Sequence, residues 1–256
     1  MSGASGVMSV ILLETAVGGS VVLWASGVWG AVRRGFFLLM GVSVVLSALG
    51  AWALTRSAAA QSAAGGRAVA GLAVFTGLLA LWQVLLVARQ RALSRVVGLV
   101  AALAGLVALV LFAFLREDAV PSAVAELVLG SAFLGSTLFG LLLGHWYLVE
   151  RRLSNVYMLR SAWFYIGGVV AAVAAVALSA TNPVEPATLG LNPLLAVPSF
   201  SLLLAGGFVT LCALIAGFVW KLANEGGRSI QAATGYFYLA VIMGVPAELA
   251  TKFRFF

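Results

Sequence analysis

Charge is scarce in this chain. Only 9% of its 256 residues are charged, while 63% are hydrophobic. A soluble domain carries about 25% charged residues, so this chain has too few to cover a water-facing surface. The apolar residues also come in runs of about twenty, the length that crosses the hydrocarbon core of a bilayer. The sequence therefore predicts an integral membrane protein.

Cysteine and histidine are almost absent. Cys212 is the one cysteine and His145 the one histidine. The chain by itself cannot supply the ligands of a cysteine-bound iron–sulfur cluster, a zinc site or a bis-histidine haem. We therefore expect no metal ion, haem or iron–sulfur cluster to be held by this chain alone. Its net charge of +7 is not gathered into a basic cluster, which argues against nucleic acid as a partner.

Eight apolar runs are separated by charged or Pro-rich breaks. Each is predicted to be a transmembrane helix, because the bilayer interior offers no partner to free backbone groups and the alternation typical of barrel strands is missing. The fold class is therefore all-α, in a single transmembrane domain over residues 1–256. The predicted spans are Val7 to Gly30, Gly35 to Leu54, Ala68 to Ala88, Val96 to Leu115, Ala123 to Val149, Ala162 to Ala180, Ser199 to Trp220 and Ala232 to Thr251.

Lysine and arginine predict the orientation. Ten of the 15 basic residues follow odd-numbered spans, which places these connections in the cytoplasm and both chain ends outside. We expect a multi-pass protein of a bacterial-type cytoplasmic membrane. The inner group is Arg33, Arg34, Arg89, Arg91, Arg95, Arg151, Arg152, Arg160, Lys221 and Arg228, and the outer group is Arg56, Arg67, Arg116, Lys252 and Arg254.

The first and fifth spans share a short pattern. ETAVGGS begins at Glu14 and ELVLGSA begins at Glu126, each with small residues one turn after the glutamate. Such an echo is typical of internal duplication, although chance similarity between apolar segments explains it equally well. Duplication would divide the chain into halves over residues 1–118 and 119–256, with four helices in each.

Three glutamates lie within predicted spans. Glu14, Glu126 and Glu248 all fall in the outer half of the membrane under the predicted orientation. Ionisable groups there cost about 2.5 to 3.5 kcal/mol each, so they form a candidate site for handling protons or a cation. In the alternative interpretation, Glu126 is solvated near the surface and Glu248 pairs with Lys252 four residues later.

A second candidate site lies near the inner end of the fifth span. His145, Trp146 and Tyr147, with Gln83 of the third span, could hydrogen-bond and enclose a quinone. The alternatives are an interfacial aromatic belt for the first three and a helix contact for Gln83. Nineteen residues of helix, about 28 Å, separate Glu126 from His145, so the two candidate sites cannot act as one catalytic pair.

The closing segment GYFYLAVIMGVPAELATKFRFF, with the AEL of Ala247 to Leu249 as its sharpest point, resembles the membrane-anchor subunits of DMSO reductase and polysulfide reductase. Eight spans, outer termini and short loops are also similar to those anchors. The resemblance implies two four-helix bundles, quinol binding without haem, and a bound iron–sulfur protein that exchanges electrons. It also implies that Glu248 handles protons, with Glu14 as a second such residue.

These observations lead to three hypotheses about function. The first is a non-catalytic membrane subunit of a respiratory or photosynthetic electron-transfer complex, which binds quinone and anchors other protein subunits in the lipid bilayer. The second is a proton- or cation-coupled secondary transporter that uses the glutamates as its coupling site. The third is a cofactor-free membrane scaffold or assembly subunit, in which all of these polar residues serve packing or anchoring.

Overall fold

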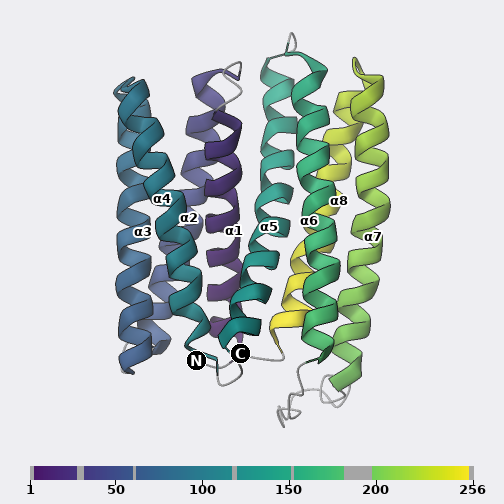
Figure 1. Ribbon diagram of the computed structural model, residues 1–256. Coiled ribbons are helices and arrows are strands. Elements are labelled where there is room, and N and C mark those ends of the chain that lie inside the picture. The colour runs from purple at the N-terminus through teal and green to yellow at the C-terminus, as the bar shows by residue number, and fades with distance from the viewer. Residues whose placement is uncertain are drawn as a thin grey trace.

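The protein is a bundle of long helices (Figure 1). The structure is a computed structural model that describes residues 3–27, 32–59, 62–116, 120–150, 153–181 and 198–253. Within these residues there are eight α-helices and no strand, so the prediction of an all-α fold is confirmed. All eight are long and apolar enough to cross a membrane, consistent with a polytopic membrane protein. They are α1 (Ala4–Gly27), α2 (Arg34–Ala59), α3 (Ala63–Val87), α4 (Arg91–Ala113), α5 (Val120–Val149), α6 (Asn155–Thr181), α7 (Pro198–Glu225) and α8 (Ser229–Lys252).

Several helices begin before the predicted spans. The spans expected from Ala68, Val96 and Ala162 belong to helices α3, α4 and α6, which start five to seven residues earlier. The sequence prediction followed apolar runs and therefore stopped at Arg67, Arg95 and Arg160. A helix can continue past such residues, because long basic side chains extend toward the headgroup region. Hydropathy marks the hydrocarbon core, and the backbone stays helical beyond it.

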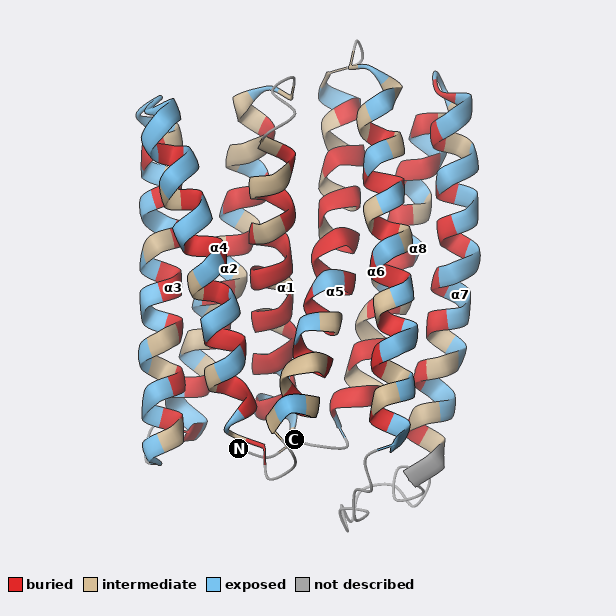
Figure 2. Cartoon of the chain, in the orientation of Figure 1, coloured by how far each residue is buried: buried red, intermediate tan, exposed pale blue. Residues whose placement is uncertain are grey.

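Helices α1 and α5 lie at the centre of the bundle. Of their most apolar stretches, 72% and 67% of the residues are buried, against 44% or less in the other six helices. Figure 2 shows the same contrast, with buried positions dominating α1 and exposed positions dominating α3 and α7. Helix α1 packs against α2, α4 and α5, and α5 packs against α1, α6 and α8. The two central helices therefore join the early and late parts of the chain.

Glycine allows α1 and α5 to touch backbone to backbone. A Cβ atom added to Gly18 would lie 1.7 Å from the carbonyl oxygen of Ser131, and one added to Gly135 would lie 2.5 Å from the Cα atom of Gly18. Neither position can hold a side chain unless the helices separate. The small residues shared by the two spans are thus the points of closest approach.

The start of α1 and the end of α8 lie at the same end of the bundle (Figure 1). An even number of crossings requires this arrangement. The Pro-rich connection between α6 and α7 falls mostly in residues 182–197, which lie outside the described part of the chain.

Candidate functional site

Five ionisable side chains are buried near the end of the bundle that holds both termini. Each of these residues is 6% exposed or less. They come from α1, from the residues after α4, from α5 and from α8. We call them the buried charge network, and they are Glu14, Arg116, Glu126, Glu248 and Lys252.

An ion pair between α1 and α8 is at the centre of this network. Nζ of Lys252 lies 2.8 Å from Oε1 of Glu14 and 3.5 Å from Oε2 of Glu248. Glu248 and Lys252 are four residues apart on α8 and therefore share one helix face. The expected contact between them is present, but the shorter contact is with Glu14. Lys252 thus connects two carboxylates from opposite ends of the sequence.

The Glu14 carboxylate faces α5 at a glycine. A Cβ atom on Gly130 would lie 2.5 Å from Oε1 of Glu14, so the absence of a side chain there provides room for the carboxylate. Neither oxygen of Glu14 accepts a well-aligned hydrogen bond from the residues that the structure describes. The contact with Lys252 is therefore close in distance without being aligned as a hydrogen bond. Charge attraction, more than directional bonding, stabilises this carboxylate.

A second ion pair lies beside the first. A guanidinium nitrogen of Arg116 donates a hydrogen bond of 2.8 Å to Oε2 of Glu126. Glu126 is only 1% exposed, so it differs from the solvated residue of the alternative interpretation. It also interacts electrostatically with Glu14 and with Lys252. The three glutamates singled out from the sequence are thus brought into one network.

The network combines three carboxylates with two basic side chains. Across the described residues, no group of three or more histidine, cysteine, aspartate or glutamate side chains has the arrangement of a metal site. Formally, the five groups carry three negative charges and two positive ones. One carboxylate can therefore accept a proton and leave the network neutral. Low polarity around it makes that exchange sensitive to small movements of Lys252.

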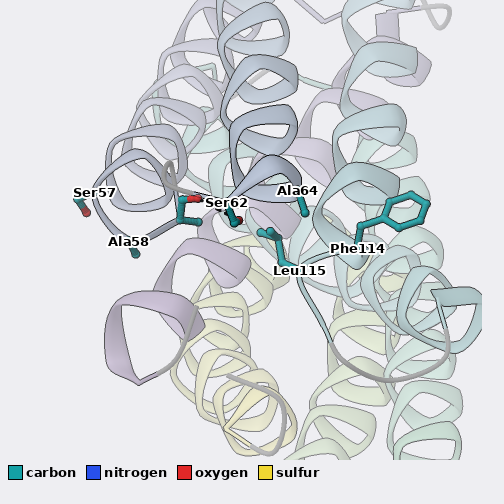
Figure 3. A pocket seen from close by; sticks show the side chains of 7 residues that line it. Ser57, Ala58, Ser62, Ala64, Phe114 and Leu115 are labelled. Atoms are coloured by element: carbon teal, nitrogen blue, oxygen red, sulfur yellow. Dashed lines mark hydrogen bonds between the residues drawn. The ribbon is translucent and has the colours of Figure 1, made fainter.

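A small cavity lies at this end of the bundle, between α2, α3 and the end of α4 (Figure 3). It has a volume of about 370 Å³ and contains no ionisable side chain. Ser62, at its edge, accepts a hydrogen bond of 2.9 Å from the backbone N–H of Gly65 and so caps α3. This cavity adds nothing to the chemistry of the charge network.

His145 forms a pair with an aromatic residue of α8. Its Nε2 atom lies 2.7 Å from the hydroxyl oxygen of Tyr238, and the two rings are 5.3 Å apart between centroids. The Tyr238 side chain is about half exposed, so the pair lies at the outer surface of the α5–α8 contact. A ligand dissolved in the bilayer can reach it from the side.

The other residues of the predicted quinone site face elsewhere. The indole N–H of Trp146 donates to Oε2 of Glu150, and its ring packs against Gly35 at the start of α2. The Tyr147 hydroxyl accepts a hydrogen bond of 3.0 Å from the backbone N–H of Met158 in α6. These contacts hold neighbouring helices together and do not converge with His145.

Gln83 contacts α2 and not the residues around His145. Its amide packs against Gly41 of α2, where a Cβ atom would overlap it. This is the helix–helix contact of the alternative interpretation. Its Oε1 atom is buried and has no hydrogen-bond partner among the described residues. The structure therefore separates Gln83 from the His145–Tyr238 pair.

Three residues that form these contacts were not predicted from the sequence to do so. Lys252 was recognised only as a partner of Glu248, Arg116 was counted only as a loop charge, and Tyr238 was not singled out. Arg116 left a detectable signal, because a basic residue ten positions before an intramembrane glutamate can fold back onto it across a short turn. Lys252 and Tyr238 meet their partners through packing of α8 against α1 and α5, which no local pattern encodes.

Comparison of the chain with known protein families, with curated proteins and with solved structures finds no match.

Proposed function

We propose that this chain is a proton-handling membrane subunit of an electron-transfer complex in a bacterial-type cytoplasmic membrane, with both termini on the outer side. The observation that carries the proposal is the fully buried contact between Glu14 and Lys252, shared with Glu248. Ionisable residues inside membrane spans are costly, and they usually belong to proton or substrate pathways. Three carboxylates and two cations placed together make a proton-binding element.

Electron transfer is supported by the resemblance of the last helix to quinol-binding anchors and by the order of helix contacts. Helices α1 to α4 contact one another in sequence and close through α1 and α4, and α5 to α8 do the same through α5 and α8. This grouping is consistent with two four-helix bundles joined along α1 and α5. Such anchors have little mass outside the membrane, so the partners that supply electrons are separate protein subunits.

His145 and Tyr238 are the residues we assign to quinone binding. Their hydrogen-bonded pair can donate to a quinone carbonyl and pass a proton to it when it is reduced. The pair is accessible from the bilayer, where quinones are dissolved. Trp146, Tyr147 and Gln83 would then support the helices around the site without contacting the quinone. The quinone is the one cofactor proposed for this chain.

Purification in mild detergent followed by quinone titration tests this assignment. We expect menaquinone or ubiquinone to bind the complex, and His145→Phe and Tyr238→Phe each to weaken that binding. Tyr157→Phe is the matched control, because the Tyr157 hydroxyl forms no hydrogen bond within the described residues and Tyr157 lies on α6. Equal binding by all four proteins would reject the quinone site. Co-purification of an iron–sulfur or cytochrome subunit is the expected result for the complex.

The charge network is tested separately by proton uptake. Glu14→Gln should slow proton uptake linked to quinone turnover, whereas Glu225→Gln should not. Glu225 lies at the opposite end of the bundle, where it accepts a hydrogen bond from Ser229. If both variants take up protons at the unmodified rate, the proton-handling role is wrong.

One observation favours a proton- or cation-coupled transporter as the second candidate. The network lies where α1, α5 and α8 meet, between the two groups of helices, and transporters often bind their ions at such a boundary. Coupled uptake of a solute into vesicles by the purified chain alone would identify this function. A chain that neither binds quinone, retains redox partners nor drives uptake would instead be a scaffold or assembly subunit.

A further inference from the structure

A large cavity opens at the end of the bundle opposite the charge network. It has a volume of about 1180 Å³ and lies between the end of α1, the start of α2, the end of α3 and the start of α4. Pockets for drug-sized ligands are typically about 300–1,000 Å³, so this one has room for a larger molecule. Its walls are largely apolar and include the rings of Trp24, Phe37 and Trp82.

Arginine surrounds this cavity. The five arginines among its lining residues are Arg33, Arg34, Arg89, Arg91 and Arg95. Arg33 already has a partner, because its Nε atom lies 2.7 Å from Oε1 of Glu150. The other four have no carboxylate partner within the residues that the structure describes. The rim is therefore strongly positive while the interior is apolar.

Four helix ends meet this rim. Helices α2 and α4 begin here, at Arg34 and Arg91, and their amino-terminal ends carry partial positive charge and free backbone N–H groups. Helices α1 and α3 end here, and their carboxyl-terminal ends carry partial negative charge. The helix ends largely offset one another, so the positive potential of the rim comes from the arginine side chains.

Arg89 occupies an unfavourable backbone conformation at this rim. Its φ of 61° is in the left-handed region, where glycine or asparagine is usual and a long side chain is rare. Arg89 follows the last residues of α3, and the N–H groups of Arg89 and Gln90 donate to the carbonyls of Leu86 and Leu85. A left-handed residue in this place closes the end of a helix. The turn also brings the guanidinium of Arg89 to the rim of the cavity.

We propose that this cavity binds an anionic phospholipid from the surrounding bilayer. The phosphate would be held by Arg34, Arg89, Arg91 and Arg95, since guanidinium groups form paired hydrogen bonds with phosphate oxygens. An acyl chain would lie against the aromatic wall. Basic pockets between membrane helices are suited to this class of ligand. The proposal is independent of the function proposed for the charge network.

Two features favour a lipid over a free anion or a quinone. A free phosphate would leave the apolar wall of Trp24, Phe37 and Trp82 unused, and a neutral quinone would leave the four arginines without a counter-charge. The cavity combines both chemistries in one place. Trp24 also donates a hydrogen bond of 3.1 Å to the carbonyl oxygen of Arg95, which connects the apolar wall directly to the basic rim.

Lipid binding to the purified full-length chain tests the proposal. Native mass spectrometry would compare phosphatidylglycerol with phosphatidylcholine, which differ in net charge and share the same acyl chains. We expect a clear preference for phosphatidylglycerol, and roughly 30-fold weaker binding in the double variant Arg91→Gln/Arg95→Gln. The single variant Trp82→Leu should weaken binding of both lipids, because it alters only the apolar wall.

The control variant is Arg56→Gln/Arg67→Gln, which removes the same charge from the other end of the bundle. It should retain the preference. The proposal would be overturned if both double variants lost the same affinity for phosphatidylglycerol, or if the unmodified chain bound the two lipids equally. Either result would mean that the arginines serve only to orient the chain in the membrane. If inorganic phosphate competes with phosphatidylglycerol equally well in the unmodified chain and in Trp82→Leu, the site binds a free anion instead of a lipid.

Discussion

Nζ of Lys252, in the last turn of α8, lies 2.8 Å from Oε1 of Glu14 in α1, and both side chains are almost completely buried. The first and last helices of the chain are therefore joined by opposite charges. Because water is excluded there, each charge depends on the other. Removing Lys252 alone leaves two buried carboxylates, Glu14 and Glu248, without this cation, whereas removing Glu14 as well leaves only Glu248 without it.

Lys252→Met should destabilise the protein strongly. Breaking a buried pair by removing one partner costs about 3–5 kcal/mol, since the remaining carboxylate of Glu14 loses its closest cation. Thermal unfolding in detergent measures the effect. The double variant Glu14→Gln/Lys252→Met should recover part of the loss, because Glu14 no longer needs a counter-charge while Glu248 still lacks Lys252. Lys221→Met, at an exposed position on α7, is the matched control and should leave the melting temperature nearly unchanged.

Gly18→Leu should disrupt the contact between α1 and α5. A side chain at Gly18 would overlap the backbone of Ser131, so the central helices would have to separate at a cost of about 1–3 kcal/mol or more. Gly77→Leu, at a helix position with open space around it, should be neutral or stabilising. Similar melting temperatures for the two variants would show that the close approach is unimportant.

Tyr147→Phe should lower stability without changing quinone binding. The hydroxyl accepts the backbone N–H of Met158 in the first turn of α6 and donates to the carbonyl of Ser154. Its loss removes a partner from the buried N–H of Met158, at a cost of about 1–3 kcal/mol, while the Ser154 carbonyl still accepts from the N–H of Tyr157. Parallel unfolding and quinone-titration measurements separate the two roles. Reduced quinone affinity with unchanged stability would contradict this structural role.

Arg89→Gly should raise stability, because glycine adopts φ of 61° without the penalty of about 1–2 kcal/mol that a side chain carries there. Gly227→Ala provides the reverse comparison. Gly227 has φ of 56° and nothing within 4 Å of an added Cβ atom, so only the backbone penalty should appear. Chemical unfolding of both variants checks the pair. A loss of stability in Arg89→Gly would mean that the guanidinium contributes more than its backbone costs.

The helices were predictable because the bilayer imposes a simple rule on long apolar runs. The first residues of the helices were harder to predict, because Arg91 and Arg160 belong to helices that extend beyond the apolar segment. Grouping Glu14, Glu126 and Glu248 required only that all three lie toward the same end of the bundle, the end that holds the start of α1 and the end of α8. Finding Lys252 as the closest partner of Glu14 required the packing of α8 beside α1, which is set by contacts spread over the whole chain.

The side chains of the predicted quinone site point in different directions. Successive residues of an α-helix are rotated by about 100°, so His145, Trp146 and Tyr147 face different neighbours. The structure directs them to α8, to the start of α2 and to α6 respectively. Helix periodicity alone was sufficient to separate them. Tyr238, by contrast, depends on the register between α5 and α8, and no pattern within either helix reveals it.

The Glu14–Lys252 contact also bears on how the protein is made. Helix α1 leaves the ribosome before α8, so Glu14 is synthesised long before its counter-charge. A nascent chain that has reached α7 carries this carboxylate without Lys252. Insertion of α8 is therefore the step that supplies the cation of this pair.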